Sequence, residues 1–356
     1  MSDTKIAADR VIRLFEVLHR KGLFSGGVLA GYNGQAIRTG VYGMADYRSD
    51  ARLTADSLYE LASVTKPLTA TAVQLLEQRK RLRYDDPLVR WLPALPYRDV
   101  TVRQALMHVS GLPDYMELLE QHGEPSSIAT NEDVIRLLAE RCPPPLFPAG
   151  ERYEYSNTGY VCLASVIEAA SGMAYAEFMR AHLFVPAGMK RSRIYNRRLK
   201  PEVIDDLAHG WIKEGAEWDR YRLPDELDAL NFVVRLDGIQ GDGTAHSTLH
   251  DLLAYDTALR DGKLLSSDSL LQATASFRLP DGSRTPCGFG WFLSTTPSGD
   301  LLLSHSGGWP GYWTRFVRTV ADARVLIVLA NVEEAETESV RAVLDEAERI
   351  WFGVYR

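Results

Sequence analysis

Segments typical of β-strands lie at both ends of this chain, and helical patterns fill its middle. Near the N-terminus, residues 27–32 and 35–42 are strand-like, and Asn33-Gly34 between them suits the positive φ angles of a tight hairpin turn. Short runs rich in aromatic and β-branched residues return after about Gly241, at 289–294, 301–304, 312–319 and 324–331. Because hairpin signals occur without regular β-α-β alternation, we expect one antiparallel sheet to which both ends of the chain contribute.

Helical patterns flank and interrupt these strands. Apolar residues recur every three or four positions over residues 7–18 and again over 340–351, which predicts a helix near each terminus. Four shorter helical patterns lie between Pro-rich connections, at 68–78, 134–140, 158–170 and 175–183. Residues 196–240 show weak periodicity and are expected to be irregular and exposed.

These patterns predict an α+β fold in which helices flank the antiparallel sheet. Residues 1–66 and 241–356 would form a discontinuous sheet domain, and residues 67–240 an inserted, mostly helical domain. A cleft between two such regions is a common place for an active site.

Composition restricts the class of protein. Apolar residues make up 46% of the 356 residues and charged residues 24%, which is typical of a soluble globular protein. The net charge of −7, without a block of Lys and Arg, argues against a nucleic-acid partner. The longest apolar run, 325–330, is far shorter than the roughly 20 residues of a membrane helix, and no signal-like stretch follows Met1. The 3 cysteines are widely spaced. We therefore expect a cytoplasmic protein with reduced thiols and no membrane partner, if Met1 is its natural start.

The candidate nucleophile is Ser63, which forms a Ser-x-x-Lys motif with Lys66. A proline is tolerated in a helix only within the first turn, so Pro67 predicts a helix beginning near Ser63. Lys66 would then project from the same side as Ser63. A serine hydroxyl needs a base, and lysine serves only if desolvation or nearby charge lowers its pKa. The pair alone leaves open that Ser63 is a helix cap and Lys66 a solvated charge.

A second candidate cluster is Tyr155-Ser156-Asn157, which precedes the helical pattern at 158–170. A phenol beside Lys66 can exchange protons with the nucleophile and the leaving group, and the Asn157 amide can orient substrate and lysine. The alternative is that Asn157 or Ser156 caps the helix and Tyr155 packs in the core.

A third cluster runs from Leu303 to Gly311 and contains His305, Gly307 and Gly308. Here a strand is expected to end in residues small enough for substrate to lie against the backbone. The N–H of Gly308 can pair with the N–H of the nucleophile to stabilise an oxyanion. The alternative is a Gly-rich hairpin with an incidental histidine.

Taken in order, the motifs Ser63-x-x-Lys66, Tyr155-x-Asn157 and His305-Ser-Gly307 resemble the serine β-lactamase and penicillin-binding protein family. The nearest branch holds class C β-lactamases, D-aminopeptidases, D,D-carboxypeptidases and related carboxylesterases. The resemblance extends over residues 27–331. It includes the stretches 62–67, 106–113, 147–150, 186–189, 241–243 and 288–291.

This resemblance implies a β-lactamase/transpeptidase-like fold and an acyl-enzyme mechanism without a metal or cofactor. Ser63 would be the nucleophile, and Lys66 with Tyr155 would transfer protons. The resemblance places Asn157, His305, Gly307 and Gly308 in substrate binding, with the N–H groups of Gly308 and Ser63 forming the oxyanion hole.

His305 is a departure from the family pattern, because β-lactamases of this branch usually have lysine there. An unperturbed histidine is largely neutral at pH 7, so the site lacks a fixed charge that would attract a substrate carboxylate. Family members with histidine here include peptidases and esterases, so His305 makes a β-lactamase less favoured without deciding between the other two. We expect a small-molecule ester or amide hydrolase, with carboxylesterase-type activity as the first expectation. The alternatives are a D-amino-acid peptidase or amidase, and a weak β-lactamase.

Other readings of the sequence have less support. An α/β-hydrolase is disfavoured because no Gly-x-Ser-x-Gly elbow occurs. His246 and His250 have the i, i+4 spacing of a metal pair, but no Glu follows the first histidine as in zinc proteases. A catalytically inactive binding protein on the same fold remains an alternative, although all three motifs are present.

Overall fold

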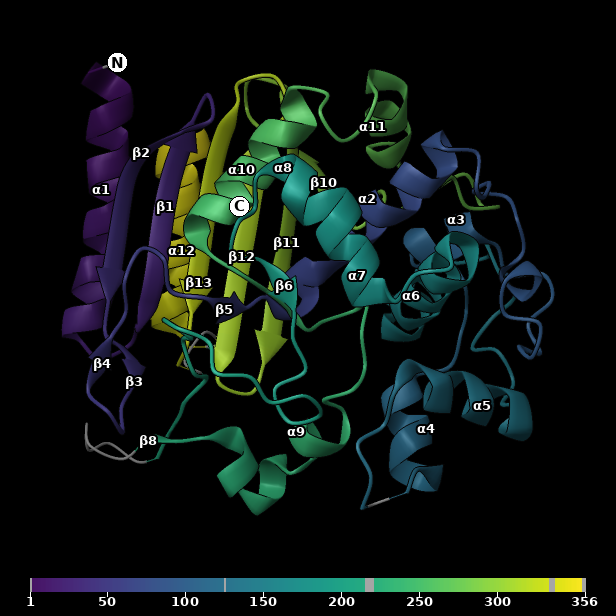
Figure 1. Ribbon diagram of the computed structural model, residues 1–356. Helices are drawn as coiled ribbons and strands as arrows, with labels where there is room; N and C mark the ends of the chain where they lie inside the picture. The colour runs from purple at the N-terminus through teal and green to yellow at the C-terminus, as the bar shows by residue number, and fades with distance from the viewer. Residues whose placement is uncertain (1, 125, 215–220, 333–336, 354–356) are drawn as a thin grey trace.

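The computed structural model describes residues 2–124, 126–214, 221–332 and 337–353, and its centre is a six-stranded antiparallel sheet (Figure 1). The strand order is β10-β11-β12-β13-β1-β2. The strands are β1 (Gly26–Tyr32), β2 (Gln35–Tyr42), β10 (Phe292–Thr295), β11 (Leu301–Trp309), β12 (Tyr312–Thr319) and β13 (Arg324–Ala330). The first strand pairs with the last, from Gly26 opposite Ala330 to Tyr32 opposite Arg324. The antiparallel sheet built from both ends of the chain is therefore confirmed.

Helices α1 (Ser2–Arg20) and α12 (Glu338–Phe352) cover one face of this sheet (Figure 1). Side chains alternate between the two faces of a strand. Val28 of β1 and Leu326 of β13 point toward the terminal helices, where they join a buried cluster with Phe15 and Trp351. The two expected terminal helices thus bury their apolar stripes against the sheet.

Helix α10 (Leu249–Arg260) covers the opposite face and contacts β1 and β13. Gly27 and Gly31 of β1 make this close packing possible, because a Cβ on either would lie within 2.9 Å of Leu249 or Leu253. Leu29 and Ile327 point into the same layer.

The helical block lies beside the sheet and contains α2 (Thr65–Gln78), α3 (Val102–Leu106), α4 (Tyr115–His122), α5 (Asn131–Arg141), α6 (Asn157–Ser171) and α7 (Tyr175–Met179). The π-helical segment η3 (Arg180–Phe184) and α8 (Val185–Ala187) continue α7. Val73 of α2 and Ile167 of α6 share one buried cluster with Leu29 and Phe316 of the sheet. The helical block therefore packs directly on the sheet. The division of the chain into a sheet domain (1–66 and 241–356) and an inserted domain (67–240) stays a prediction.

Short elements connect these layers. They are β3 (Met44–Asp46), β4 (Ala51–Arg52), β5 (Tyr59–Glu60), η1 (Ala62–Val64), η2 (Leu88–Arg90), β6 (Arg193–Ile194), β7 (Ile212–Lys213), β8 (Tyr221–Arg222), η4 (Pro224–Glu226), η5 (Asp228–Leu230), α9 (Phe232–Arg235), β9 (Ala245–Ser247) and α11 (Ser267–Ala273). A small sheet has the order β5-β9-β6. No single helix among the described residues is long and apolar enough to cross a membrane, although the bent pair Asn157–Ser171 and Tyr175–Ala187 together has that length and composition.

The structure corrects two strand boundaries. Strand β10 begins at Phe292 rather than 289, because Gly290 has a φ of +75° and interrupts the extended backbone. Strand β11 continues to Trp309 instead of ending at 304, because it pairs with β12 as far as Trp309 opposite Tyr312. The region expected to be irregular, 196–240, holds only short elements, and its residues 215–220 lie outside those described.

Candidate active site

Ser63 lies in the short turn η1, between strand β5 and helix α2. Strand β5 is held by β9, with Glu60 opposite His246, and the Leu61 N–H donates to Ala245 O at 2.8 Å. Ala62 then turns the chain through a φ of +46°, which is uncommon for a residue other than glycine. Strained backbone of this kind is frequent at functional sites.

The helix predicted near Ser63 begins two residues later, at Thr65, after the 3-10 turn. Pro67 occupies the first turn of α2 as expected. Ser63 itself makes no side-chain capping bond to α2 among the described residues, so the helix-cap alternative is wrong.

Lys66 is fully buried at 0% exposure and points back at Ser63. Its Nζ donates to Ser63 Oγ at 3.1 Å, to Asn157 Oδ1 at 2.8 Å and to the backbone carbonyl of Asp242 at 2.9 Å. An ammonium has three donors, and each has an acceptor here. Lys66 is therefore not a solvated charge, and its head group is fixed beside the serine hydroxyl.

Asn157 is the first residue of α6, and Ser156 caps that helix by accepting from the Gly159 N–H at 3.1 Å. The cap and the Lys66 contact coexist, because the capping bond uses the side chain of Ser156 and leaves the Asn157 amide free to face Lys66.

Tyr155 is 36% exposed, and its ring centroid lies 4.9 Å from Lys66 Nζ. No hydrogen bond joins its hydroxyl to Ser63 or Lys66 in the described part of the chain. The ring stacks on His108, with centroids 4.4 Å apart and planes 22° from parallel. The structure therefore places the ring of Tyr155 beside Lys66, and its part in proton transfer stays a prediction.

His108 supports Tyr155, and no role was assigned to it from sequence. Its Nδ1 accepts from the Ser156 N–H at 3.0 Å, and its backbone has a φ of +57°. Burial, followed by the charge on Lys66, holds the pKa of His108 well below its usual value. A neutral imidazole therefore lies beneath the Tyr155 ring.

His305 is buried on β11, and its Nδ1 lies 2.7 Å from the backbone carbonyl of Ser306. Burial, the charge on Lys66 and, less strongly, Arg315 lower the pKa of His305 to about 3. With Nδ1–H donating to this carbonyl, Nε2 is an acceptor, and it has no partner among the described residues. The site thus carries a neutral imidazole at this position.

Gly307 and Gly308 line Ser63 from the β11 side. A Cβ on Gly307 would lie 2.3 Å from Leu61 O and 2.9 Å from Ser63 N, so only glycine allows this approach. Thr314 Oγ1 fixes the same contact by donating to Leu61 O at 2.7 Å. A Cβ on Gly308 would meet nothing within 4 Å, which leaves its backbone open to the pocket.

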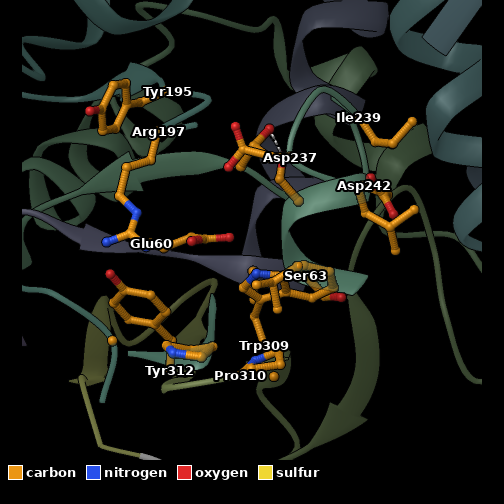
Figure 2. Close-up of a pocket in the computed structure, with 18 of the residues that line it drawn as sticks. Glu60, Ser63, Tyr195, Arg197, Asp237, Ile239, Asp242, Trp309, Pro310 and Tyr312 are labelled. Carbon is orange, nitrogen blue, oxygen red and sulfur yellow. Dashed lines mark hydrogen bonds between the residues drawn. The ribbon is translucent and has the colours of Figure 1, made fainter. Parts of the chain in front are cut away.

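Ser63, Asn157 and Gly308 line one pocket, which extends away from the serine toward Glu60 and Arg197 (Figure 2). Much of its wall comes from the region 196–240, which was expected to be irregular: Arg197, Arg198, Leu207, Gly210, Pro224, Val233, Leu236, Asp237 and Ile239. Weak periodicity gave no signal for these residues.

The structure places the histidine pair of the metal alternative on different elements. His246 is on strand β9 and His250 is on helix α10, so the two do not share a helix face. Among the described residues, no group of three or more His, Cys, Asp or Glu side chains is arranged to hold a metal ion.

Comparison with known proteins shows which family has this sequence and fold. The model of the Beta-lactamase family matches residues 11–348. Penicillin-binding protein 4* of Bacillus subtilis is 45% identical over 340 residues, covering 96% of this chain and 75% of the relative. A D-aminopeptidase of Brucella anthropi is 27% identical over 92% of this chain, which spans only 62% of that relative's length. The crystal structure of D-amino acid amidase from Ochrobactrum anthropi SV3 superposes with a TM-score of 0.75 at 25% identity, covering 96% of this chain and 97% of the amidase.

Proposed function

This chain belongs to the beta-lactamase family of serine hydrolases, and we propose that it cleaves ester or amide bonds of small molecules through an acyl-enzyme on Ser63. The observation that carries the proposal is the buried Lys66 ammonium, whose Nζ lies 3.1 Å from Ser63 Oγ. Burying a cation is costly unless it is paired or used, and here it is aimed at a hydroxyl that opens on a pocket.

In the proposed acylation step, Lys66 reacts as the neutral amine, after its ammonium has released one proton to solvent. Ser63 Oγ then bonds to the substrate carbonyl carbon as the hydroxyl proton passes to Lys66 Nζ. The negative charge that develops on the carbonyl oxygen is stabilised by the N–H groups of Ser63 and Gly308. Tyr155 then passes its phenol proton to the departing alcohol or amine as the bond between that group and the carbonyl carbon breaks, and the phenolate takes up the proton that Lys66 received from Ser63. Water attacks the resulting ester and regenerates Ser63, with the same groups acting in reverse.

We propose carboxylesterase-type turnover as the first activity to look for. The neutral His305 supports it, because the site presents no cation at that position to favour substrates with a terminal carboxylate. Hydrolysis of D-amino-acid amides or peptides is the second candidate. It is favoured by the likeness to the amidase structure, which extends over 97% of that chain.

A substrate panel with wild-type protein and Ser63→Ala tests the proposal. The panel compares p-nitrophenyl acetate, a D-amino-acid p-nitroanilide and a chromogenic cephalosporin. We expect turnover of the ester that disappears in Ser63→Ala. Turnover of p-nitrophenyl acetate by Ser63→Ala at the wild-type rate would overturn the assignment of the nucleophile.

We also propose that the protein acts in a reducing compartment such as the cytoplasm. All three cysteines, Cys142, Cys162 and Cys287, are free thiols in the structure, which is the usual state there. Fractionation of the native host tests this, and recovery of the protein only from an exported fraction would contradict it.

A further inference from the structure

Glu60 places a carboxylate in the pocket beside the candidate nucleophile. It is the last residue of β5, three positions before Ser63, and its backbone is fixed opposite His246 of β9. Glu60 and Ser63 line the same pocket. Figure 2 shows the Glu60 side chain lying across the pocket between Arg197 and Tyr312, with Ser63 on the far side. A substrate held at Ser63 therefore has Glu60 within the same cavity.

The other carboxylates of this pocket already have donors. Asp237 accepts from the backbone N–H groups of Arg198 and Leu199, at 2.8 and 2.9 Å. Asp242 accepts from the Tyr115 hydroxyl at 3.0 Å. The Glu60 carboxylate, by contrast, accepts no hydrogen bond and forms no ion pair with any side chain in the described ranges.

The two arginines of the pocket, Arg197 and Arg198, pair with carboxylates other than Glu60. Arg197 Nη2 donates to Asp225 at 2.7 Å. Arg198 pairs with Asp225 at 3.2 Å and with Asp237 at 3.1 Å. Once Glu60 is ionised, the guanidinium groups of Arg197 and Arg198 therefore face three carboxylates, those of Asp225, Asp237 and Glu60. Both guanidinium groups are paired with the two aspartates, so the negative charge of Glu60 has no partner.

The remaining groups that face Glu60 do not remove this excess. Burial lowers the pKa of His246 to about 4, so its ring is neutral at pH 7. Tyr312 donates its hydroxyl proton to Ala208 O at 2.8 Å. The Lys66 ammonium is held by its three acceptors near Ser63.

We propose that Glu60 forms a subsite for a cationic group of the substrate, a primary ammonium, next to the acylation site. The inference rests on the proposed function, because it places the cation on a molecule whose carbonyl group reaches Ser63. An ammonium would supply the hydrogen-bond donors that the Glu60 carboxylate lacks. Burial raises the pKa of Glu60 to about 7, against the opposing charges of Arg198 and Arg197, and a bound cation would lower that pKa again.

Inhibition of p-nitrophenyl acetate hydrolysis tests the subsite without assuming a natural substrate. The probes are butylammonium, butanol and butyrate, which share a chain length and differ in charge. In wild-type protein we expect butylammonium to inhibit at least about tenfold more tightly than butanol, because a hydrogen bond to a charged group has about that effect. The advantage should grow between about pH 6 and about pH 8 as Glu60 ionises, since an alkylammonium stays protonated throughout.

Glu60→Gln should abolish this advantage and its pH dependence while leaving inhibition by butanol as in wild type. Glu120→Gln is the matched control, because Glu120 is an exposed carboxylate of α4 outside the pocket lining, and it should behave as wild type. Thermal unfolding of each variant checks that it is folded.

Two results would overturn the proposal: tighter inhibition by butyrate than by butylammonium, or an ammonium preference that persists in folded Glu60→Gln. If wild-type protein hydrolyses no ester, the proposed function fails instead. Calorimetric titration of wild-type protein and Glu60→Gln with butylammonium then decides the subsite separately, since weaker binding by the variant supports it and equal binding rejects it.

Discussion

Replacement of Lys66 by methionine is the perturbation that most directly separates catalysis from folding. Methionine keeps the length and apolar stem of the side chain but removes the donors to Ser63, Asn157 and Asp242. Loss of general-base assistance alone lowers rates by about 10²- to 10⁴-fold. We expect kcat/KM to fall at least about 10³-fold, which is about 4 kcal/mol of transition-state stabilisation.

The expected effect on stability is much smaller, because two contributions oppose each other. Asn157 Oδ1 and the Asp242 carbonyl each lose a donor, and an unsatisfied buried acceptor costs about 1–3 kcal/mol. Removing the fully buried cation also removes its desolvation cost of several kcal/mol, and this gain offsets the loss of the hydrogen bonds. The free energy of unfolding should therefore change by no more than about 2 kcal/mol, of either sign.

The assay combines kcat/KM for p-nitrophenyl acetate with urea unfolding of the same samples. Lys21→Met is the matched control, because Lys21 is an exposed lysine that follows α1, and it should match wild type in both measurements. A folded Lys66→Met protein that keeps more than about a tenth of the wild-type kcat/KM would refute the role of Lys66 as the base.

Three further results are expected. Tyr155→Phe should lower kcat at least about 100-fold with little change in KM, because the phenol transfers a proton. Steady-state kinetics measure both constants, and an unchanged kcat would exclude Tyr155 from proton transfer. Gly307→Ala should lower kcat/KM at least about 100-fold, because its Cβ would lie 2.9 Å from Ser63 N. Gly308→Ala should fold with unchanged stability, because a Cβ there would meet nothing within 4 Å. Equal kcat/KM in Gly307→Ala and wild type would count against the close approach of Gly307 to Ser63. Burial lowers the pKa of His246 to about 4, so the unfolded imidazole, with a pKa near 6.5, takes up a proton before the folded one. Stability should fall by about 2 kcal/mol from this residue between about pH 7.5 and about pH 5, and His246→Gln should lose that part; urea unfolding at both pH values measures it, and an identical pH dependence would contradict it.

The sheet could be predicted because its signals are local. Asn33 and Gly34 adopt φ angles of +52° and +74°, as a tight hairpin turn requires, and they fix the pairing of β1 with β2. The apolar run of β13 is buried between β12 and β1, where both of its faces are covered. Such a strand is recognised by composition alone.

The end of β11 could not be predicted in the same way. Ser306, Gly307 and Gly308 have low strand propensity, so the sequence favours an end at Ser304. The strand nevertheless continues, because β12 pairs with it as far as Trp309. Long-range pairing here overrides local preference.

The site was predicted in part for a related reason. Ser63 and Lys66 are near one another in sequence, and Asn157 belongs to a short motif. The third acceptor of Lys66 is the backbone carbonyl of Asp242, and a backbone group has no signature in the sequence. The pocket wall formed by residues 195–239 has no periodicity, and only the fold brings Arg197 and Asp237 near Ser63.

The stacking of His108 beneath Tyr155 shows the same limit. In the sequence, the stretch 106–113 shows a resemblance to the family and nothing that assigns a role to His108. Its physical role appears when the two rings are seen 4.4 Å apart and Nδ1 accepts from the Ser156 N–H.

Mass spectrometry of the protein after exposure to a penicillin or a serine-reactive phosphonate shows whether Ser63 is the residue that is acylated. We expect a single covalent adduct, mapped by peptide fragmentation to Ser63 and lost in Ser63→Ala. A labelled protein in which the adduct maps to any other residue, or a folded protein that hydrolyses esters and forms no adduct at Ser63 with either reagent, would contradict it.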